Sequence, residues 1–444
     1  MAEATTALST GSQATDEVQV ALDLLDELFA GFGNADFAVR LWDGTCWGPR
    51  PEQARTILVL RHPGSLRLFL SKPTHRHLAE CYLHDTVDVD GDMEGMLPVA
   101  EWLLQRPLGL ADRLHLIHRV LKLPRGNGLH RRHPERGPAQ LRGLAHSLER
   151  DRAAVTYHYD VSNRFYSLWL GRQMVYSCAL FAREGEDLDR AQERKLEYIC
   201  RKLRLQRGDR LLDIGCGWGG LILHAARHYG VEGLGITLSQ PQADLANERL
   251  RAAGLADRCR AEVCDYRELR DDRGFDKAVS IGMVEHVGRD QLEAYFGTAF
   301  RLLRPGGTFL NHGIADLPSR PPRKRGGFIG TYVFPDGDLP PIPRILATAE
   351  ACGFEARDVE SLREHYALTL REWVRRLEAH REEAVADAGE ATYRIWRLYM
   401  SGCAHWFSRG HISVFQALLV KTQAGSSGLP LLRSDWYDPP LAVA

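Results

Sequence analysis

The strongest pattern along the chain is an alternation of short apolar runs with helix-like stretches. Five runs follow one another in the second half of the sequence: "RLLDIGCG", "VEGLGITLS", "CRAEVCDY", "FDKAVSIGM" and "GGTFLNHGI". This alternation predicts an α/β fold with a doubly wound, mostly parallel sheet and helices on both faces. The segments "TLREWVRRLEAHREEAVA" and "ATYRIWRLYMSGCAHWF" then predict a helical C-terminal region.

A different pattern occupies the N-terminal part. Leu22, Leu25, Leu28 and Phe29 recur at helical spacing before Gly31, which favours a helix that ends there. The short alternating segments "FAVRLWDG", "TILVLRH" and "SLRLFLS" are separated by Gly and Pro and are predicted to be strands and turns. "MLPVAEWLLQR" and "LADRLHLIHRVLKL" are predicted to be helices. Together these elements predict a smaller α+β domain.

The patterns also set domain boundaries. Residues 1–16 are small and polar and are expected to be disordered, and residues 17–124 form the α+β domain. Residues 125–150 contain a basic stretch with Gly and Pro and no hydrophobic period, so they are predicted to be a linker. Residues 151–444 form the α/β domain, with a long Pro/Gly/Arg-rich insert at 315–345. Contact of the linker with lipid phosphates is the minority interpretation beside a solvated connector.

Composition narrows the class of protein. A chain of 444 residues favours two domains, and a net charge of −1 provides no global field to attract nucleic acid or an anionic membrane. The nine cysteines show neither paired spacing nor a Cys/His metal motif, which favours reduced thiols in a cytoplasm and no metal site. We see no signal peptide and no apolar stretch of about 20 residues. The protein is expected to be soluble or to lie on a membrane surface.

The segment "LLDIGCGWGG" predicts a nucleotide site. Gly215 and Gly217 stand where the first strand turns into a helix, so the backbone can approach a ligand closely. Their spacing differs from the GxGxxG that fits a pyrophosphate, and Asp213 before them suits an ammonium group. We therefore expect S-adenosylmethionine. At the ends of the next two strands, Thr237 with Gln242 and Asp265 with Tyr266 are the polar candidates, Asp265 for the adenine amino group or as a helix N-cap.

A second candidate site follows the fourth and fifth strands. In "SIGMVEHVG", Glu285 and His286 follow an apolar run, which fits either a solvated charge pair or a catalytic group at the mouth of a pocket. In "NHGIAD", His312 ends the fifth run. Ligands collect at the carboxyl ends of strands in open parallel sheets, so Glu285 and His312 are expected to converge. His286 is then a structural partner.

Seven segments together are similar to those of one family, the cyclopropane-fatty-acyl-phospholipid synthases, and the mycolic-acid cyclopropane synthases share most of them. They are "YHYDVSNRFYSLWL", "MVYSCALF", "LLDIGCGWGG", "GITLS", "CDYREL", "GMVEHVG" and "YVFPDGDLP", within Tyr157 to Gln416. The resemblance implies a Rossmann-like class I methyltransferase domain that transfers a methylene from S-adenosylmethionine to a cis double bond of a phospholipid acyl chain. It also implies a bicarbonate ion that removes the final proton.

The resemblance also implies binding partners and a location in the cell. The N-terminal domain looks like the lipid-associated domain of the bacterial phospholipid enzymes. An unsaturated membrane phospholipid is therefore the implied partner, with peripheral contact at the inner face of the membrane from the cytoplasm. A homodimer is implied, and no nucleic acid.

Site residues carried over from the resemblance fall into two groups. The implied bicarbonate site comprises Cys178, Glu285, His312, Ile314 and Tyr366. Cys403 matches a cysteine once considered a nucleophile, although a packed thiol is the preferred interpretation. The implied cofactor contacts are Tyr176, Ser177, Gly215, Gly217, Thr237, Gln242, Asp265 and Tyr266. Aromatic residues near these motifs, among them Tyr159, Phe165, Tyr166, Trp169, Tyr332 and Phe334, are mostly expected to pack in the core.

Three alternatives stay open or are set aside. A related enzyme of the same family could leave a methyl branch, because both products share one cation and differ in the proton lost. An adenine-specific nucleic-acid methyltransferase would place D/N-P-P-Y where this chain has "GMVEH". A non-catalytic lipid-binding protein is disfavoured because all five implied bicarbonate positions are occupied by matching residues.

Overall fold

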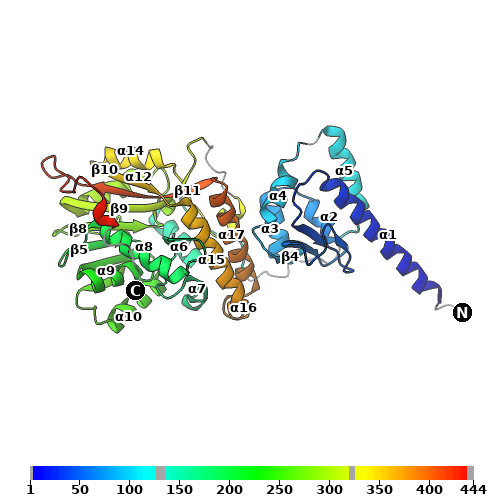
Figure 1. Ribbon diagram of the computed structural model, residues 1–444, viewed down its shortest axis with the longest axis horizontal. Helices are drawn as coiled ribbons and strands as arrows, with labels where there is room; N and C mark the ends of the chain where they lie inside the picture. Colours follow the sequence, from blue (N-terminus) through cyan, green and yellow to red (C-terminus); the bar gives the residue numbers. More distant parts are fainter. Residues whose placement is uncertain (1–3, 108, 127–135, 160, 320–325, 438–444) are drawn as a thin grey trace. The chain divides into compact units, whose positions relative to one another are not determined.

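The chain forms two compact units, shown in Figure 1. The computed structural model describes residues 4–107, 109–126, 136–159, 161–319 and 326–437, with side chains from residue 16 onward. The first unit comprises Met1–Gly137 and Gly389–Gly402, and the second comprises Pro138–Ala388 and Cys403–Ala444. The sequence predicted the order of the two units. It placed Gly389–Gly402 in the larger domain, however, whereas the structure groups this segment with the smaller one.

The first unit is an α+β domain. In its described residues a four-stranded sheet has the order β2-β1-β3-β4, and β1 and β3 are parallel. The strands are β1 Phe37–Arg40, β2 Cys46–Trp47, β3 Thr56–Leu60 and β4 Val87–Gly91. The helices are α1 Ala4–Leu28, α2 Ser65–Leu70, α3 His75–Leu83, α4 Met96–Gln105 and α5 Leu110–Lys122.

Two local predictions in this unit differ from the structure. The segment "SLRLFLS", predicted as a strand, forms α2, and its buried Leu66 and Phe69 stand three residues apart, as on one face of a helix. Tertiary packing thus overrides the alternating pattern. Helix α1 begins at Ala4, within the segment expected to be disordered. Helix propagation adds one hydrogen bond for each residue fixed, so the helix seeded around Leu24 and Leu25 continues upstream.

Two arginines explain why Gly389–Gly402 belongs to the first unit. Arg394 is buried, forms ion pairs with Asp85 and Asp88 at 3.1 Å each, and donates to the backbone oxygen of Tyr82. Arg397, also buried, donates to the backbone oxygens of Val89 and Gly91. Buried guanidinium groups are stable only when their donors are satisfied, so this segment of α17 (Glu390–Ser408) is held by the β4 region.

The second unit contains the predicted doubly wound sheet. Seven strands in its described residues have the order β10-β11-β9-β8-β5-β6-β7, and the five strands from β5 to β9 are parallel. These five coincide with the five apolar runs, so the predicted fold class is confirmed. Their bounds are β5 Arg210–Ile214, β6 Glu232–Thr237, β7 Cys259–Val263, β8 Phe275–Ile281 and β9 Leu303–Asp316.

Both faces of this sheet are covered by helices, and α12 and α14 lie opposite α8 and α9 in Figure 1. On β5, the neighbouring residues Leu211 and Leu212 enter different core clusters, one with α8 and α9 and the other with α12 and α14. A strand buried on both faces must be apolar at consecutive positions, which explains the continuous runs. The helices of this unit are α6 Leu148–Tyr159, α7 Asn163–Leu170, α8 Leu188–Leu203, α9 Gly220–Tyr229, α10 Gln240–Ala252, α11 Val284–Val287, α12 Leu292–Leu302, α13 Phe328–Tyr332, α14 Ile342–Ala351, α15 Arg363–Ala379 and α16 Arg381–Ala388.

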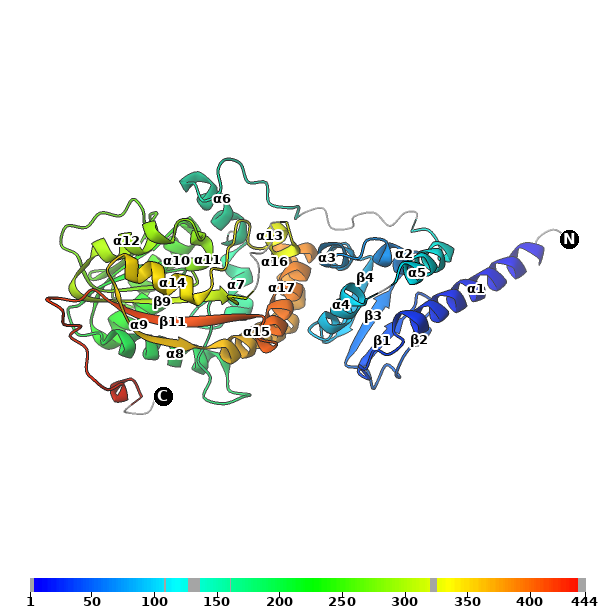
Figure 2. The same cartoon turned by 90° about the horizontal axis from the view of Figure 1, so that it is seen from above.

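Two strands were not predicted. β10 (Glu355–Ser361) and β11 (Ile412–Val420) extend the sheet beyond β9, and both neighbouring pairs are antiparallel. Figure 2 shows β11 beside β9. Pairing with β11 lengthens β9, so His312 lies inside this strand and not at its end, opposite Ile281 of β8 and Gln416 of β11.

The predicted insert is partly ordered as α13 and the start of α14. Its basic residues 320–325, like residues 127–135 of the predicted linker, lie outside the described residues. Within the described ranges, none of the helices combines the length and the apolar character needed to cross a bilayer.

Candidate active site

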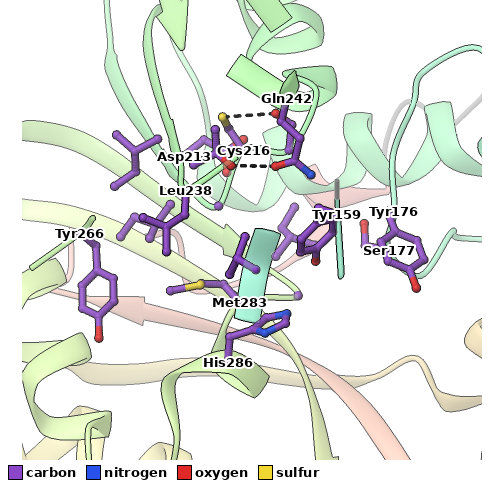
Figure 3. Close-up of a pocket in the computed structure, with 18 of the residues that line it drawn as sticks. Tyr159, Tyr176, Ser177, Asp213, Cys216, Leu238, Gln242, Tyr266, Met283 and His286 are labelled. Carbon is purple, nitrogen blue, oxygen red and sulfur yellow. Dashed lines mark hydrogen bonds between the residues drawn. The ribbon is translucent and has the colours of Figure 1, made fainter. Parts of the chain in front are cut away.

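One cavity lies beside the carboxyl ends of β5, β6, β7 and β8, where β5 and β8 form the switch point of the sheet. All nine residues predicted to contact the cofactor line it: Tyr176, Ser177, Asp213, Gly215, Gly217, Thr237, Gln242, Asp265 and Tyr266. Figure 3 shows Tyr266 at one end of the cavity and Tyr159, Tyr176 and Ser177 at the other, with Asp213 and Leu238 between them.

The glycine turn shapes the middle of the cavity. Gly215 and Gly217 have φ angles of +85° and +53°, which residues with a Cβ rarely adopt. The backbone N–H groups of Gly215 and Cys216 both donate to the oxygen of Ile236, at 2.9 and 3.0 Å. The turn is thereby held against the end of β6 and leaves its inner surface to a ligand.

The ends of β6 and β7 supply polar groups, as predicted. The Thr237 hydroxyl donates to Oε1 of Gln242 at 2.7 Å and so fixes the amide at the cavity wall. Asp265 is buried, but its carboxylate is bound by Arg267, whose Nε and Nη2 donate at 2.8 and 2.7 Å. Arg267 also bonds Asp151 of α6 at 2.9 Å. Arg267 was not predicted as a site residue. A basic residue two positions after Asp265 could have indicated an ion pair with that carboxylate.

A buried lysine stands at the other end of the cavity. Lys195 of α8 lines it and donates to the Ser177 hydroxyl at 2.9 Å. Burial lowers the pKa of Lys195 to about 7, and burial raises the pKa of Asp213 to about 7, with each group partly offsetting the other. Lys195 was not predicted either. It lies on the apolar face of an amphipathic helix, between Ala191 and Ile199, and a lysine at such a position indicates a buried functional group.

Aromatic rings surround the same end. Tyr159 and His286 line the cavity, and their ring centroids are 6.2 Å apart. His286, expected to be only a structural partner, therefore faces the ligand space, and burial lowers its pKa to about 4. Behind them, Tyr176 contacts Trp169 and Trp373, with centroids at 5.5 and 5.2 Å. The expected core positions of Phe165, Tyr166, Trp169 and Tyr332 are confirmed by their burial.

The residues of the implied bicarbonate site form a layer behind this cavity and are absent from its lining. Glu285 is the second residue of α11 and is buried, and its Oε1 accepts from the Ile314 N–H at 2.6 Å. Its Oε2 is buried and has no hydrogen-bond partner among the described residues. Burial raises the pKa of Glu285 to about 7, so a substantial fraction of the carboxyl is protonated at neutral pH. Glu285 and Ile314, which the family resemblance assigns to one site, are thus in direct contact.

The two ring nitrogens of His312 differ in their hydrogen bonding within the described residues. Its Nδ1 lies 3.2 Å from Nε2 of Gln416, which is buried on β11. Its Nε2 is buried and has no partner in the described part of the chain. Burial lowers the pKa of His312 to about 3, and the charges of Lys195 and Lys202 act in the same direction, so the imidazole is neutral. Gln416 was missed because β11 itself was not predicted.

Tyr366 and the two cysteines complete this layer. Burial raises the pKa of the Tyr366 phenol, and the centroid of its ring lies 4.7 Å from that of Phe407 and 6.1 Å from that of Trp373. Burial also raises the pKa of Cys178, and the thiol lies 3.6 Å from the backbone oxygen of Leu362. A thiol held neutral is a poor nucleophile, which agrees with the non-nucleophilic interpretation of Cys178. Cys403 is buried, as expected for a packed thiol.

Known proteins resemble this chain in sequence and in structure. The sequence profile of the mycolic acid cyclopropane synthetase family matches residues 146–417. The chain belongs to this family. A probable fatty acid methyltransferase of Pseudomonas putida is 41% identical over 403 residues, which cover 90% of this chain and 95% of the relative. A probable fatty acid methyltransferase of Mycobacterium tuberculosis is 37% identical and is covered to 97%.

Solved structures of the family agree. A cyclopropane synthase of Mycobacterium tuberculosis aligns with 60% of this chain and 97% of its own, at 34% identity and a TM-score of 0.57. A mycolic acid cyclopropane synthase crystallised with SAH and CTAB gives the same coverage and TM-score at 36% identity. The recognised family is thus confirmed, and the chain is an S-adenosylmethionine-dependent methyltransferase with the family's class I fold.

Proposed function

We propose that this enzyme transfers a methylene from S-adenosylmethionine to the cis double bond of an unsaturated phospholipid acyl chain, giving a cyclopropane. The observation that carries the proposal is the buried layer behind the cofactor cavity, where Glu285 and His312 each present a polar atom that has no hydrogen-bond partner among the described residues. A simple methyl transfer to a heteroatom needs no such layer. Ring closure needs a group that removes a proton from the transferred methyl in a dry site.

The cofactor is proposed to lie along the cavity with its adenosine toward Asp265 and Tyr266. Its amino-acid end then meets Asp213, which accepts from the ammonium, and Lys195 with Ser177, which donate to the carboxylate. S-Adenosylmethionine supplies an electrophilic methyl group on a sulfonium. The alkene attacks this methyl carbon, the carbon–sulfur bond breaks, and the acyl chain becomes a carbocation. Tyr159 and the neighbouring rings exclude water and present π faces to positive charge.

A bicarbonate ion fits the second layer because burial keeps its walls uncharged. Burial raises the pKa of Glu285 to about 7, and its protonated form can donate from Oε2, because Oε1 is already bound to Ile314. Neutral His312 and the Tyr366 phenol are further donors. Such donors hold a singly charged anion without the repulsion that an ionised glutamate would cause. When bound, bicarbonate supplies a small base, and the proton leaves the methyl as the ring closes.

Gln416 is proposed to position His312. The amide N–H donates to Nδ1, so the neutral imidazole carries its proton on Nε2, which has no partner within the described ranges of the chain. A Gln416→Leu variant should lose this preference and about tenfold or more in turnover. Gln416→Asn, which keeps an amide, should retain more activity. The measurement is long-range ¹H–¹⁵N correlation of labelled histidines, with His312→Ala assigning the signal. If the His312 tautomer is unchanged in Gln416→Leu, Gln416 does not position the imidazole.

The reaction itself is tested with labelled S-adenosylmethionine and unsaturated phospholipid vesicles, followed by mass spectrometry of the acyl chains. We expect label in cyclopropane chains. Adding bicarbonate to a bicarbonate-depleted enzyme should restore turnover, and substitution of the vesicle lipid by saturated chains should abolish it. Absence of label from the lipid would overturn the proposal.

A second candidate is a lipid methyltransferase that leaves a methyl branch. The names of the two full-length relatives, both probable fatty acid methyltransferases, favour it. The carbocation is the same, and the outcome depends on which proton the base reaches. Methyl-branched chains in the experiment above would select this candidate.

A further inference from the structure

Helix α5 (Leu110–Lys122) presents a row of large apolar side chains to solvent. Leu110, Leu114, Ile117 and Leu121 are 77%, 60%, 55% and 57% exposed. Their spacing of four, three and four residues places all four on one face of the helix. Figures 1 and 2 both show α5 at the periphery of the first unit.

The opposite face is what holds α5 in place. Leu116 and Val120 pack against the core of the first unit. His115 and Arg119 form ion pairs with Glu27 of α1, at 3.1 and 3.6 Å. The helix is therefore ordered by its inner side, and the apolar row is left free by the fold.

This row stands apart from the ordinary scatter of surface leucines. In the first unit, for the side chains that the structure describes, the exposed large hydrophobic residues are the four on α5. Single exposed apolar residues are normal, whereas a contiguous apolar row marks an interaction surface.

Basic residues flank the row. Arg113 lies on one side of it and His118 and Lys122 on the other, at the helical positions next to the leucines. Among the described residues, Arg113 and Lys122 pair with no carboxylate. The acid of α5, Asp112, lies on the other side of the helix and accepts from the Gly109 N–H. An apolar row with a basic rim is typical of a helix that lies in the interface of an anionic membrane.

We propose that this face of α5 docks the enzyme on an anionic lipid bilayer, with the apolar row among the acyl chains and the basic rim at the phosphates. The inference deepens the proposed function, and rests on it in that the substrate is a membrane lipid. A second copy of the chain fits less well. Four side chains on one helix are far fewer than the roughly 20 residues a side of a stable interface. Two such faces would also bring Arg113 and Lys122 of both copies together.

The test measures co-sedimentation of the full-length chain with diphytanoyl vesicles, which are fluid but have no double bond and so cannot be substrate. We expect binding to phosphatidylglycerol vesicles at least about tenfold stronger than to phosphatidylcholine vesicles. Leu114→Glu/Ile117→Glu should lose about tenfold or more of this binding, and Arg113→Glu/Lys122→Glu should lose the preference for the anionic lipid.

Leu431→Glu/Leu432→Glu is the matched control, because these leucines of the second unit are 98% and 73% exposed. It should bind vesicles as the parent chain does. All the side chains changed are at the surface, so thermal unfolding should be unaffected. Parent-like binding by Leu114→Glu/Ile117→Glu would overturn the proposal. So would conversion of a dimer to a monomer by this variant in sedimentation velocity, which would assign the face to a second copy.

Failure of the docking surface and failure of the reaction are distinguishable. Turnover of a dispersed, detergent-solubilised unsaturated phospholipid should survive Leu114→Glu/Ile117→Glu, while turnover in anionic vesicles falls with binding. If the parent chain binds diphytanoyl vesicles but labels no lipid, the surface stands and the proposed reaction does not.

Discussion

A Glu285→Gln variant is expected to lose turnover by roughly 10²- to 10⁴-fold while it binds S-adenosylhomocysteine as the parent chain does. The amide keeps the size of the side chain and can still accept from Ile314, but its N–H donates to the proposed bicarbonate more weakly than a carboxylic O–H and cannot share a proton with it. Cofactor binding should survive because Glu285 lies behind the cavity wall. His312→Ala is expected to behave in the same way. Turnover is measured by label in lipid, and binding by isothermal titration calorimetry.

The pH dependence of stability gives this variant an independent check. Burial raises the pKa of Glu285 from 4.5 in the unfolded chain to about 7 in the folded one. Between these pH values the folded state binds the extra proton, so its stability falls as pH rises, by roughly 3 kcal/mol in all. Thermal unfolding at pH 5 and pH 8 should therefore show Glu285→Gln gaining stability over the parent chain at the higher pH. Equal shifts in both proteins would mean that Glu285 is ionised throughout.

A Lys195→Met variant is expected to bind S-adenosylhomocysteine roughly 10- to 100-fold more weakly, because a hydrogen bond from a charged donor in a buried site is worth about 1.5–3 kcal/mol. Lys195 reaches the cavity beside Ser177, where the carboxylate of the cofactor is proposed to lie. Ser177→Ala removes a neutral donor and should weaken binding only about fivefold. Isothermal titration calorimetry of the parent chain, Lys195→Met and Ser177→Ala at one pH measures the order of their affinities for S-adenosylhomocysteine.

The control for Lys195→Met is Lys277→Met, which removes a half-buried lysine of β8 that does not line the cavity. Its cofactor affinity should match that of the parent chain. If Lys195→Met also binds normally, the amino-acid end of the cofactor lies elsewhere, and Asp213 loses its proposed role with it. A loss of affinity in both lysine variants would instead indicate a general effect of charge.

Local sequence patterns were enough to predict the parts of the fold in which conformation depends on residues close together in the sequence. β5, β6, β8 and β9 each bury consecutive residues, so they contain continuous apolar runs, and the turn at Gly215 and Gly217 needs positive φ angles. Both features are visible without knowledge of distant contacts. The nine cofactor-lining positions follow from them together with the family resemblance, since they stand at the ends of these strands and beside them.

Other features depended on partners far away in the sequence. β11 pairs with β9, and β10 pairs with β11, both antiparallel, and no local hydrophobic period predicts either pairing. Gln416 contacts His312 only because β11 lies beside β9. α2 forms from an alternating segment because packing of Leu66 and Phe69 outweighs a weak local preference. Arg394 joins the first unit across some 300 residues because its buried charge needs Asp85 and Asp88.

The sequence by itself therefore determined the class of fold, the cofactor turn and the positions that line the cavity, because these follow from backbone geometry and from short motifs. Only the tertiary structure decided the protonation of those residues. The pKa of Glu285 is raised and that of His312 is lowered because burial removes the water that would stabilise either charge. Burial is a property of the packed chain as a whole, and the same holds for the apolar face of α5, which the fold leaves in solvent.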